Sequence, residues 1–150
     1  MKNAEPRALV IVLVVCLAAL GSSGCTSRPD FVITGDTNSV TVDNRTEEFF
    51  FTIQAKDELV DARINYQPND NETGELLNFT QLFHKFGDIT EGDSRLFSTE
   101  VEVLNSNGSL VEQINFHFGV STDNYHGTMS RSVRYVRSSE TNGSRYTLLI

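Results

Sequence analysis

Apolar and polar side chains alternate along several segments of this chain, and this period of two is the feature that most limits its fold. In residues 48–55 the odd-numbered positions are apolar, and Phe50 is the one apolar residue among the others. In residues 60–66 the even-numbered positions are apolar and the odd-numbered ones polar. Because successive side chains of a β-strand point to opposite faces of a sheet, both segments predict half-buried strands.

The same alternation recurs in the second half of the chain. Residues 97–103 and 110–120 alternate on either side of Asn107-Gly108, and an Asn-Gly pair between alternating runs predicts a hairpin. A second Asn-Gly turn is expected at Asn142-Gly143. Further strands are expected at residues 31–42 (as one edge strand or two short ones), 133–137 and 146–150, and polar loops at 67–75 and 121–130.

One segment has a different period. Leu76, Phe79, Phe83 and Phe86 recur at steps of three and four residues, as on one face of a helix. Gly87 follows, and glycine is a common helix end. The pattern predicts one short helix at about residues 75–86, with an irregular pair of strands as the alternative.

Seven or eight short strands separated by turns predict a mainly β domain over residues 31–150, folded as an antiparallel two-sheet sandwich. A partly closed antiparallel barrel is the alternative. The strand–turn–strand segment 48–66 resembles the opening of immunoglobulin-like domains in prokaryotic surface proteins. That resemblance implies an immunoglobulin-like sandwich.

The first 24 residues have the three parts of a secretory signal peptide. Lys2 and Arg7 give a basic start, residues 8–20 form an unbroken apolar run, and Gly-Ser-Ser-Gly follows. The run has 13 residues, which is short for a helix that crosses a bilayer, since that takes about 20. We therefore expect the chain behind it to be exported.

Ser23, Gly24 and Cys25 resemble the cleavage region of a prokaryotic lipoprotein signal, in which a cysteine after small residues becomes the first mature residue. The resemblance implies that residues 1–24 are removed and that Cys25 is lipidated. Residues 25–30 would then tether the domain to the outer face of the cytoplasmic membrane, and a diacylglycerol-type group would supply the two chains that stable attachment takes. The alternatives are an ordinary signal peptide cut nearby and an uncleaved anchor.

The expected mature part is acidic and contains little lysine. The signal peptide holds two of the 12 basic residues and one of the 20 acidic ones, so residues 25–150 carry a formal net charge of −9. Lys56 and Lys85 are its only lysines. Such composition resembles that of haloarchaeal-type secreted proteins, where salt screens self-repulsion; a mildly acidic domain kept soluble by its charge is the alternative. A nucleic-acid partner is disfavoured, because phosphate binding depends on Lys and Arg.

Asn-x-Ser/Thr triplets, the acceptor pattern of N-glycosylation, are more frequent than the composition predicts. About two would occur by chance, whereas the expected mature part has five of them. They begin at Asn44, Asn71, Asn78, Asn107 and Asn142. We expect surface glycosylation, with the general richness of turns in Asn, Gly and Ser as the alternative explanation.

We find no motif of catalytic chemistry, and therefore predict no catalytic residue, no metal site and no cofactor. The three histidines are scattered, whereas a zinc site needs three or four close ligands; His126 with Asp123 would be a partial site at most. Residues 69–74 place oxygen ligands at alternate positions, as in a calcium loop, but Thr80 stands where a bidentate Glu is required. The exported part has no Gly-x-Ser-x-Gly pentad of the hydrolase type.

The charge is unevenly distributed along the chain. Arg131, Arg134, Arg137 and Arg145 make the last 20 or so residues net positive, whereas residues 30–123 are strongly negative. One interpretation is that these arginines pair internally with acidic neighbours. The other is that they contact an anionic ligand or a lipid headgroup.

These observations together predict a non-enzymatic, lipid-anchored β-sandwich that acts as a binding or accessory module of the cell envelope. Its expected partners are the membrane, through the lipid on Cys25, and a protein or a glycan. The alternative is a small envelope hydrolase or a substrate-binding subunit, with a site built from the loops at 67–75 and 121–130. Acidic residues and His126 converging in one pocket would favour that alternative.

Overall fold

The computed structural model describes residues 27–42, 45–79, 83–140 and 143–149. These residues form nine strands, and no helix occurs among them. The strands are β1 (Phe31–Gly35), β2 (Val40–Thr41), β3 (Thr46–Ala55), β4 (Leu59–Asp70), β5 (Phe83–Ile89), β6 (Ser94–Glu102), β7 (Gln113–Thr122), β8 (Tyr125–Glu140) and β9 (Gly143–Leu149). This part of the chain therefore contains no helix long and apolar enough to span a membrane.

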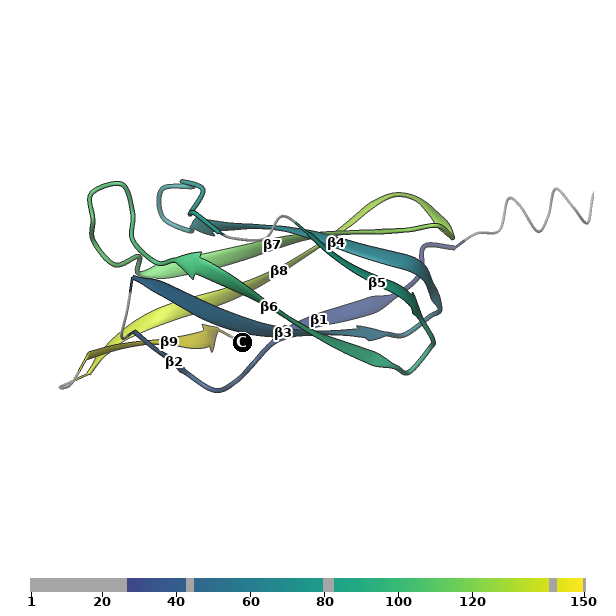
Figure 1. Ribbon diagram of the computed structural model, residues 1–150, viewed down its shortest axis with the longest axis horizontal. Coiled ribbons are helices and arrows are strands. Elements are labelled where there is room, and N and C mark those ends of the chain that lie inside the picture. Colours follow the sequence, from purple (N-terminus) through teal and green to yellow (C-terminus); the bar gives the residue numbers. More distant parts are fainter. Residues whose placement is uncertain (1–26, 43–44, 80–82, 141–142, 150) are drawn as a thin grey trace, which may run out of the picture.

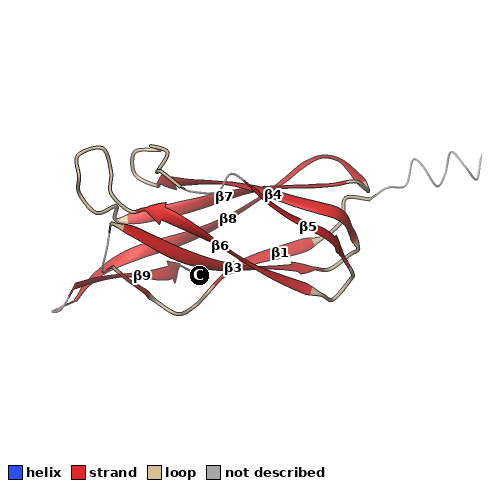
Figure 2. Cartoon of the chain, viewed as in Figure 1, coloured by secondary structure: helices blue, strands red, loops and turns tan. Residues whose placement is uncertain are grey.

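The strands form two sheets that pack face to face (Figures 1 and 2). The smaller sheet has the order β1-β3-β6, and the larger sheet has the order β2-β9-β8-β7-β4-β5. Every pairing within them is antiparallel. The predicted fold class, a mainly β antiparallel two-sheet sandwich, is confirmed.

The alternating segments bury the side chains that the sequence assigns to the inner face. Phe49, Phe51 and Ile53 of β3 are at most 1% exposed, whereas Phe50 is 47% exposed on the outer face. Across the core, β7 and β8 contribute a matching set of fully buried residues. These are Ile114, Phe116, Phe118, Val120, Met129 and Tyr135. The core is therefore the layer between the two sheets, as the period of two requires.

Strand β4 changes face at a bulge. Asp61 has a φ of 47°, and the register with β5 shifts on both sides of Ala62. Leu59 is buried and Val60 is only half-buried, so the residue before the bulge that reaches the core is Leu59. The prediction of an inward Val60 was therefore wrong by one residue, because an extra residue in a strand reverses the alternation.

The predicted helix at residues 75–86 is wrong in the part that the structure describes. Leu76 and Phe79 form isolated bridges, and Phe83 and Phe86 belong to strand β5. Leu76 and Phe83 are 56% and 57% exposed, so the apparent stripe does not lie on one buried face. The spacing of three and four residues arises from short extended segments in succession, which is the alternative that the sequence left open.

The Asn107-Gly108 turn exists, but it does not close the predicted hairpin. β6 pairs with β3 in the smaller sheet, and β7 pairs with β4 and β8 in the larger one. The arms of the turn are joined by a bridge between Leu104 and Leu110. The chain crosses between the sheets here because β6 and β7 bury their apolar side chains in the same core. β6 faces the core from the smaller sheet, and β7 faces it from the larger sheet.

Other predicted boundaries also differ from the observed ones. The expected loops are shorter, since β4 extends to Asp70, β7 to Thr122, and β8 begins at Tyr125. Residues 31–42 form two short strands, and these belong to different sheets. The second Asn-Gly turn falls partly outside the described residues, but β8 and β9 pair up to Glu140 opposite Gly143.

The sandwich has two ends, which we call proximal and distal (Figure 1). The proximal end holds the start of β1 and the turns 56–58, 90–93 and 123–124. The distal end holds the start of β3 and the loops 71–79 and 103–112. At the proximal end the Lys56 amide donates to the Asp30 carbonyl at 2.9 Å, and at the distal end the Asn71 amide donates to the Gln113 carbonyl at 2.9 Å.

Replacing Phe51 by alanine is expected to destabilise the protein by about 3–5 kcal/mol, because the change leaves a cavity among packed rings. Phe50→Ala is a matched control, and it is expected to cost less than about 1 kcal/mol because its ring faces solvent. Urea denaturation of both variants measures the difference. Equal losses in the two variants would contradict the assigned inner face of β3.

Candidate functional site

A hollow lies at the edge of the larger sheet, beside the last described residue of β9. The pairing of β9 with β8 stops where Leu149 lies opposite Arg134. β1, an edge strand of the smaller sheet, lies next to the stretch of β8 beyond this point, since the Arg131 guanidinium reaches the Phe31 carbonyl at 3.2 Å. The hollow at this edge of the larger sheet is called the edge pocket below.

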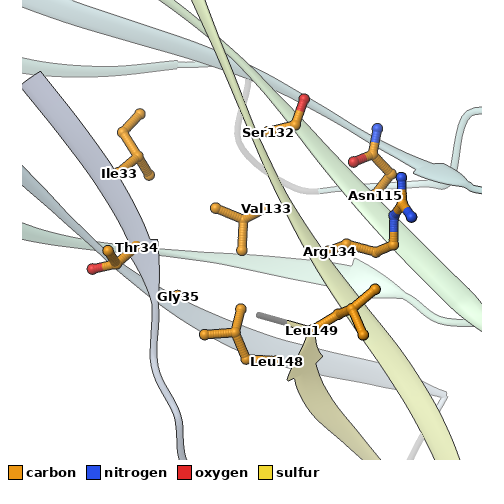
Figure 3. A pocket seen from close by; sticks show the side chains of 9 residues that line it. All are labelled: Ile33, Thr34, Gly35, Asn115, Ser132, Val133, Arg134, Leu148 and Leu149. Carbon is orange, nitrogen blue, oxygen red and sulfur yellow. The ribbon is translucent and has the colours of Figure 1, made fainter.

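The edge pocket has a volume of about 420 Å³ and a mixed lining. It is lined by Ile33, Thr34, Gly35, Asn115, Ser132, Val133, Arg134, Leu148 and Leu149. Figure 3 shows Ile33, Val133 and Leu148 gathered on one side, with Asn115 and Arg134 together on the other. An apolar wall beside a few polar groups is the usual composition of a site for a small ligand.

Gly35, one of the lining residues, lets Tyr135 and Leu148 pack directly against the backbone of β1. A Cβ at Gly35 would lie 2.6 Å from Tyr135 Oη and 2.9 Å from Leu148 Cδ1, which is closer than such atoms can approach. The Tyr135 hydroxyl donates a hydrogen bond to the Asp36 carbonyl at 3.1 Å. Burial raises the pKa of Tyr135 to about 12, and the charge of Asp36 adds to this shift. Tyr135 is therefore a neutral donor that ties β8 to the segment after β1.

The four arginines of the basic C-terminal region have different surroundings. Arg131 stacks over the Phe31 ring at 4.2 Å and lies 3.7 Å from an Asp30 oxygen. Arg137 forms an ion pair with Glu112. These two make the internal pairs that the sequence analysis considered. Arg134 lines the edge pocket, and it forms no ion pair within the part of the chain that the structure describes. Of these three arginines, Arg134 is therefore the one that is placed to meet a ligand.

A second hollow, of about 290 Å³, lies on the outer face of the larger sheet. Gly119 is the reason for it, since a Cβ there would lie 2.3 Å from the Asn65 side-chain oxygen. Phe83 forms one wall and is 57% exposed. Arg63 forms another wall, but its guanidinium is held by Asp123 at 2.6 Å. The charge of this hollow is therefore neutralised within the protein.

The residues considered for metal binding do not come together. No group of three or more His, Cys, Asp or Glu side chains suited to a metal occurs among the described residues. Asp123 pairs with Arg63, and His126 is exposed. In the calcium-like segment 69–74, Asp70 is 4% exposed and accepts a hydrogen bond from the Glu72 amide at 2.9 Å. This segment is a turn held by its own hydrogen bonds.

The two loops proposed for an enzymatic site lie at opposite ends of the molecule. Strand β7 runs between them, with Ile114 opposite Asp70 and Thr122 opposite Tyr125. Eight residues of extended strand span roughly 26 Å. Side chains from residues 71–75 and 123–124 therefore cannot form one site, and the pocket that exists is built from strands.

The structure places some of the residues proposed for modification. Cys25, Asn44 and Asn142 lie outside the described residues, so their predicted roles stay predictions. Asn71 is half-buried, whereas Asn78 and Asn107 are exposed. All three of these asparagines lie in loops of the distal end.

Sequence reasoning did not single out Asn115, Ser132 or Leu148 as residues of a site. Each occupies an ordinary position in an alternating strand. The pocket exists because β9 stops next to Arg134 while β1 of the other sheet approaches, and neither fact is encoded locally. Arg134 was noted as part of the basic region, which is the one signal that pointed to this place.

No protein-family model and no curated protein matches this chain. Among solved structures, it is similar to a β-glucosidase involved in saponin metabolism from intestinal bacteria, with 12% identity, a TM-score of 0.34, and coverage of 71% of this chain and 16% of that one. It is also similar to the C-terminal domain of Wzt, with 13% identity, a TM-score of 0.39, and coverage of 81% and 77%. The chain spans only a small part of the first of these, and similarity at this level does not extend to function.

The free energy of unfolding is expected to fall as the pH rises from 8 to 11. The pKa of Tyr135 is about 12 in the folded protein, but about 10 in the unfolded chain. The unfolded chain therefore binds fewer protons in this range, and Tyr135 alone lowers the stability by about 1.4 kcal/mol at pH 11. Urea denaturation at both pH values should show a smaller loss for Tyr135→Phe. Identical losses in the variant and the wild type would contradict this role of Tyr135.

Proposed function

We propose that this protein is a lipid-anchored, extracytoplasmic β-sandwich that acts as a binding or accessory module of the cell envelope. The signal-peptide pattern of residues 1–24 and the acceptor pattern at Cys25 support the anchoring. The membrane is one partner, through the lipid on Cys25. The other partner is an anionic glycan that binds in the edge pocket.

The way the chain enters the sandwich fits this arrangement. Asp30 is held at the proximal end, because its amide donates to an Asp57 carboxylate oxygen at 2.8 Å and its carbonyl accepts from the Lys56 amide at 2.9 Å. The five residue steps from Cys25 to Asp30 can span about 18 Å at most. A lipid on Cys25 would therefore keep the proximal end near the headgroups and turn the distal end away from the membrane.

The edge pocket is the single observation that carries the binding role. Its apolar side is built from Ile33, Val133 and Leu148, which belong to three different strands. Arg134 supplies a cation in a domain that is otherwise strongly acidic. Because strands hold their side chains more rigidly than loops do, such a pocket is preorganised for a ligand. The lining favours a ligand that has both an apolar part and a negative charge.

Cys25→Ser is expected to move the mature protein from the membrane fraction to the soluble fraction. The reason is that the acyl chains, which supply the attachment, have no acceptor in this variant. Cys16→Ser is the matched control, because that cysteine lies in the segment expected to be removed. Intact mass of the detergent-extracted wild-type chain should begin at Cys25 and include the lipid. A full-length, unmodified chain dissolved in the cytosol would disprove the anchoring.

Arg134→Ala is expected to weaken the binding of uronic-acid oligosaccharides at least fivefold, measured by titration calorimetry, since it removes the cation of the pocket. Arg95→Ala removes the same charge next to the turn 90–93 at the proximal end and should leave the affinity unchanged. Equal losses in the two variants, or no binding by the wild type, would contradict the assigned pocket.

A further inference from the structure

The three asparagines of N-glycosylation triplets that the structure describes lie at one end of the sandwich. Asn71 follows β4, Asn78 accepts a hydrogen bond from the Glu102 amide at the end of β6, and Asn107 lies in the loop between β6 and β7. All three positions belong to the distal end (Figure 1). The proximal turns 56–58, 90–93 and 123–124 contain no such triplet. The modification signals therefore lie opposite the point where the chain enters the fold.

The side-chain amides of these three asparagines differ in availability. The Asn71 Nδ2 donates to Gln113 Oε1 at 3.1 Å, and this residue is half-buried. The Asn78 Nδ2 donates to Glu102 Oε2 at 3.1 Å. Asn107 is exposed, and its side chain makes no hydrogen bond with any residue that the structure describes. Among these three asparagines, Asn107 is the one whose side-chain amide nitrogen can react without first breaking a hydrogen bond.

The turn around Asn107 is held from the inside by Asn105. The Asn105 side-chain oxygen accepts hydrogen bonds from the backbone amides of Asn107 and Ser109, both at 3.0 Å. The Asn105 amide donates to the Ser109 carbonyl at 2.9 Å, and Gly108 adopts a φ of 77°. Because these contacts use the backbone, the side chains of Asn107 and Ser109 remain exposed. The complete triplet is thus displayed on a structured turn.

We propose that Asn107 is an N-glycosylation site of the folded protein and that, among the triplets with described asparagines, it is used in preference to Asn71 and Asn78. The inference rests on the proposed export, since the glycan donor is met outside the cytoplasm. The Nδ2 of Asn107 forms a bond to the anomeric carbon of a lipid phosphate-linked oligosaccharide. The bond from that carbon to the phosphate oxygen breaks, the lipid phosphate leaves, and the amide gives up one proton.

A glycan at Asn107 has a definite position relative to the rest of the molecule. It extends from the distal end, away from the membrane that a lipid on Cys25 would contact. The edge pocket is lined by residues of β1, β7, β8 and β9, and by none of the loop 103–112. The glycan therefore covers the exposed tip of the module and leaves the pocket on its side accessible.

The test uses the full-length chain, produced in a host that exports it and transfers N-linked oligosaccharides to Asn-x-Ser/Thr. Intact mass and glycopeptide mass spectrometry measure the occupancy of each site. Asn107→Gln and Ser109→Ala should each lower the summed glycan occupancy of Asn71, Asn78 and Asn107 at least tenfold, and Ser109→Ala does so with Asn107 still present. Asn71→Gln is the matched control in the same end of the molecule and should leave the occupancy unchanged. A thermal melt establishes that each variant is folded.

Three results would overturn the inference. One is a summed glycan occupancy of Asn71, Asn78 and Asn107 that persists in both Asn107→Gln and Ser109→Ala. Another is a chain that begins at Cys25 but has the mass of a bare, lipidated polypeptide; this leaves the proposed export and anchoring intact. The last is an unprocessed chain in the cytosol, which overturns the proposed function as well, so the two failures are distinguishable.

Discussion

Contact between aromatic rings of the two sheets is the interaction on which the rest of the structure depends. The ring centroid of Phe51 of β3 lies 4.9 Å from that of Phe116 and 5.0 Å from that of Phe118, and Phe49 packs on Phe116 and Tyr135. Most of these pairs meet edge to face or tilted, which is the favourable geometry for aromatic rings. The region from Thr26 onwards contains no cysteine, so no disulfide shares this task. The sheets must be held by burial and ring packing.

The unequal widths of the two sheets create the edges at which a ligand could bind. Unpaired edges of β-sheets expose backbone N–H and C=O groups that can pair with another chain, and proteins usually cover them. Here Arg131 lies across the start of β1, stacked on Phe31 and bonded to its carbonyl oxygen. Three positions further along β8, Arg134 has no such arrangement and lines the edge pocket. One arginine thus covers an edge, and its neighbour on the same strand supplies a charge to a pocket.

Most strand faces could be predicted from the sequence, whereas the partners of the strands could not. The inward residues of β3, β6 and β7 follow from alternation alone, since side-chain direction is a local property. The predicted helix near Phe83 failed because a spacing of three or four residues can arise from consecutive short strands. The predicted hairpin at Asn107-Gly108 failed because a turn sequence does not specify which sheet receives the next strand. The edge pocket could not be predicted, since Ile33 and Arg134 are about a hundred residues apart.

The amino-acid sequence by itself determined the mainly β class, the inner faces of β3, β6 and β7 and the position of the Asn107 turn. It also contains the leader pattern and Cys25, on which the proposed anchoring rests. Only the tertiary structure decided that β6 and β7 lie in different sheets. It also decided that Arg131 and Arg137 are paired while Arg134 lines a pocket. The shared position of the described glycosylation asparagines at the distal end is a third result of the tertiary structure. The physical reason is the separation along the chain over which each property is set. Backbone geometry sets side-chain direction over two residues, whereas edges, pockets and ends arise from contacts between strands far apart in the chain.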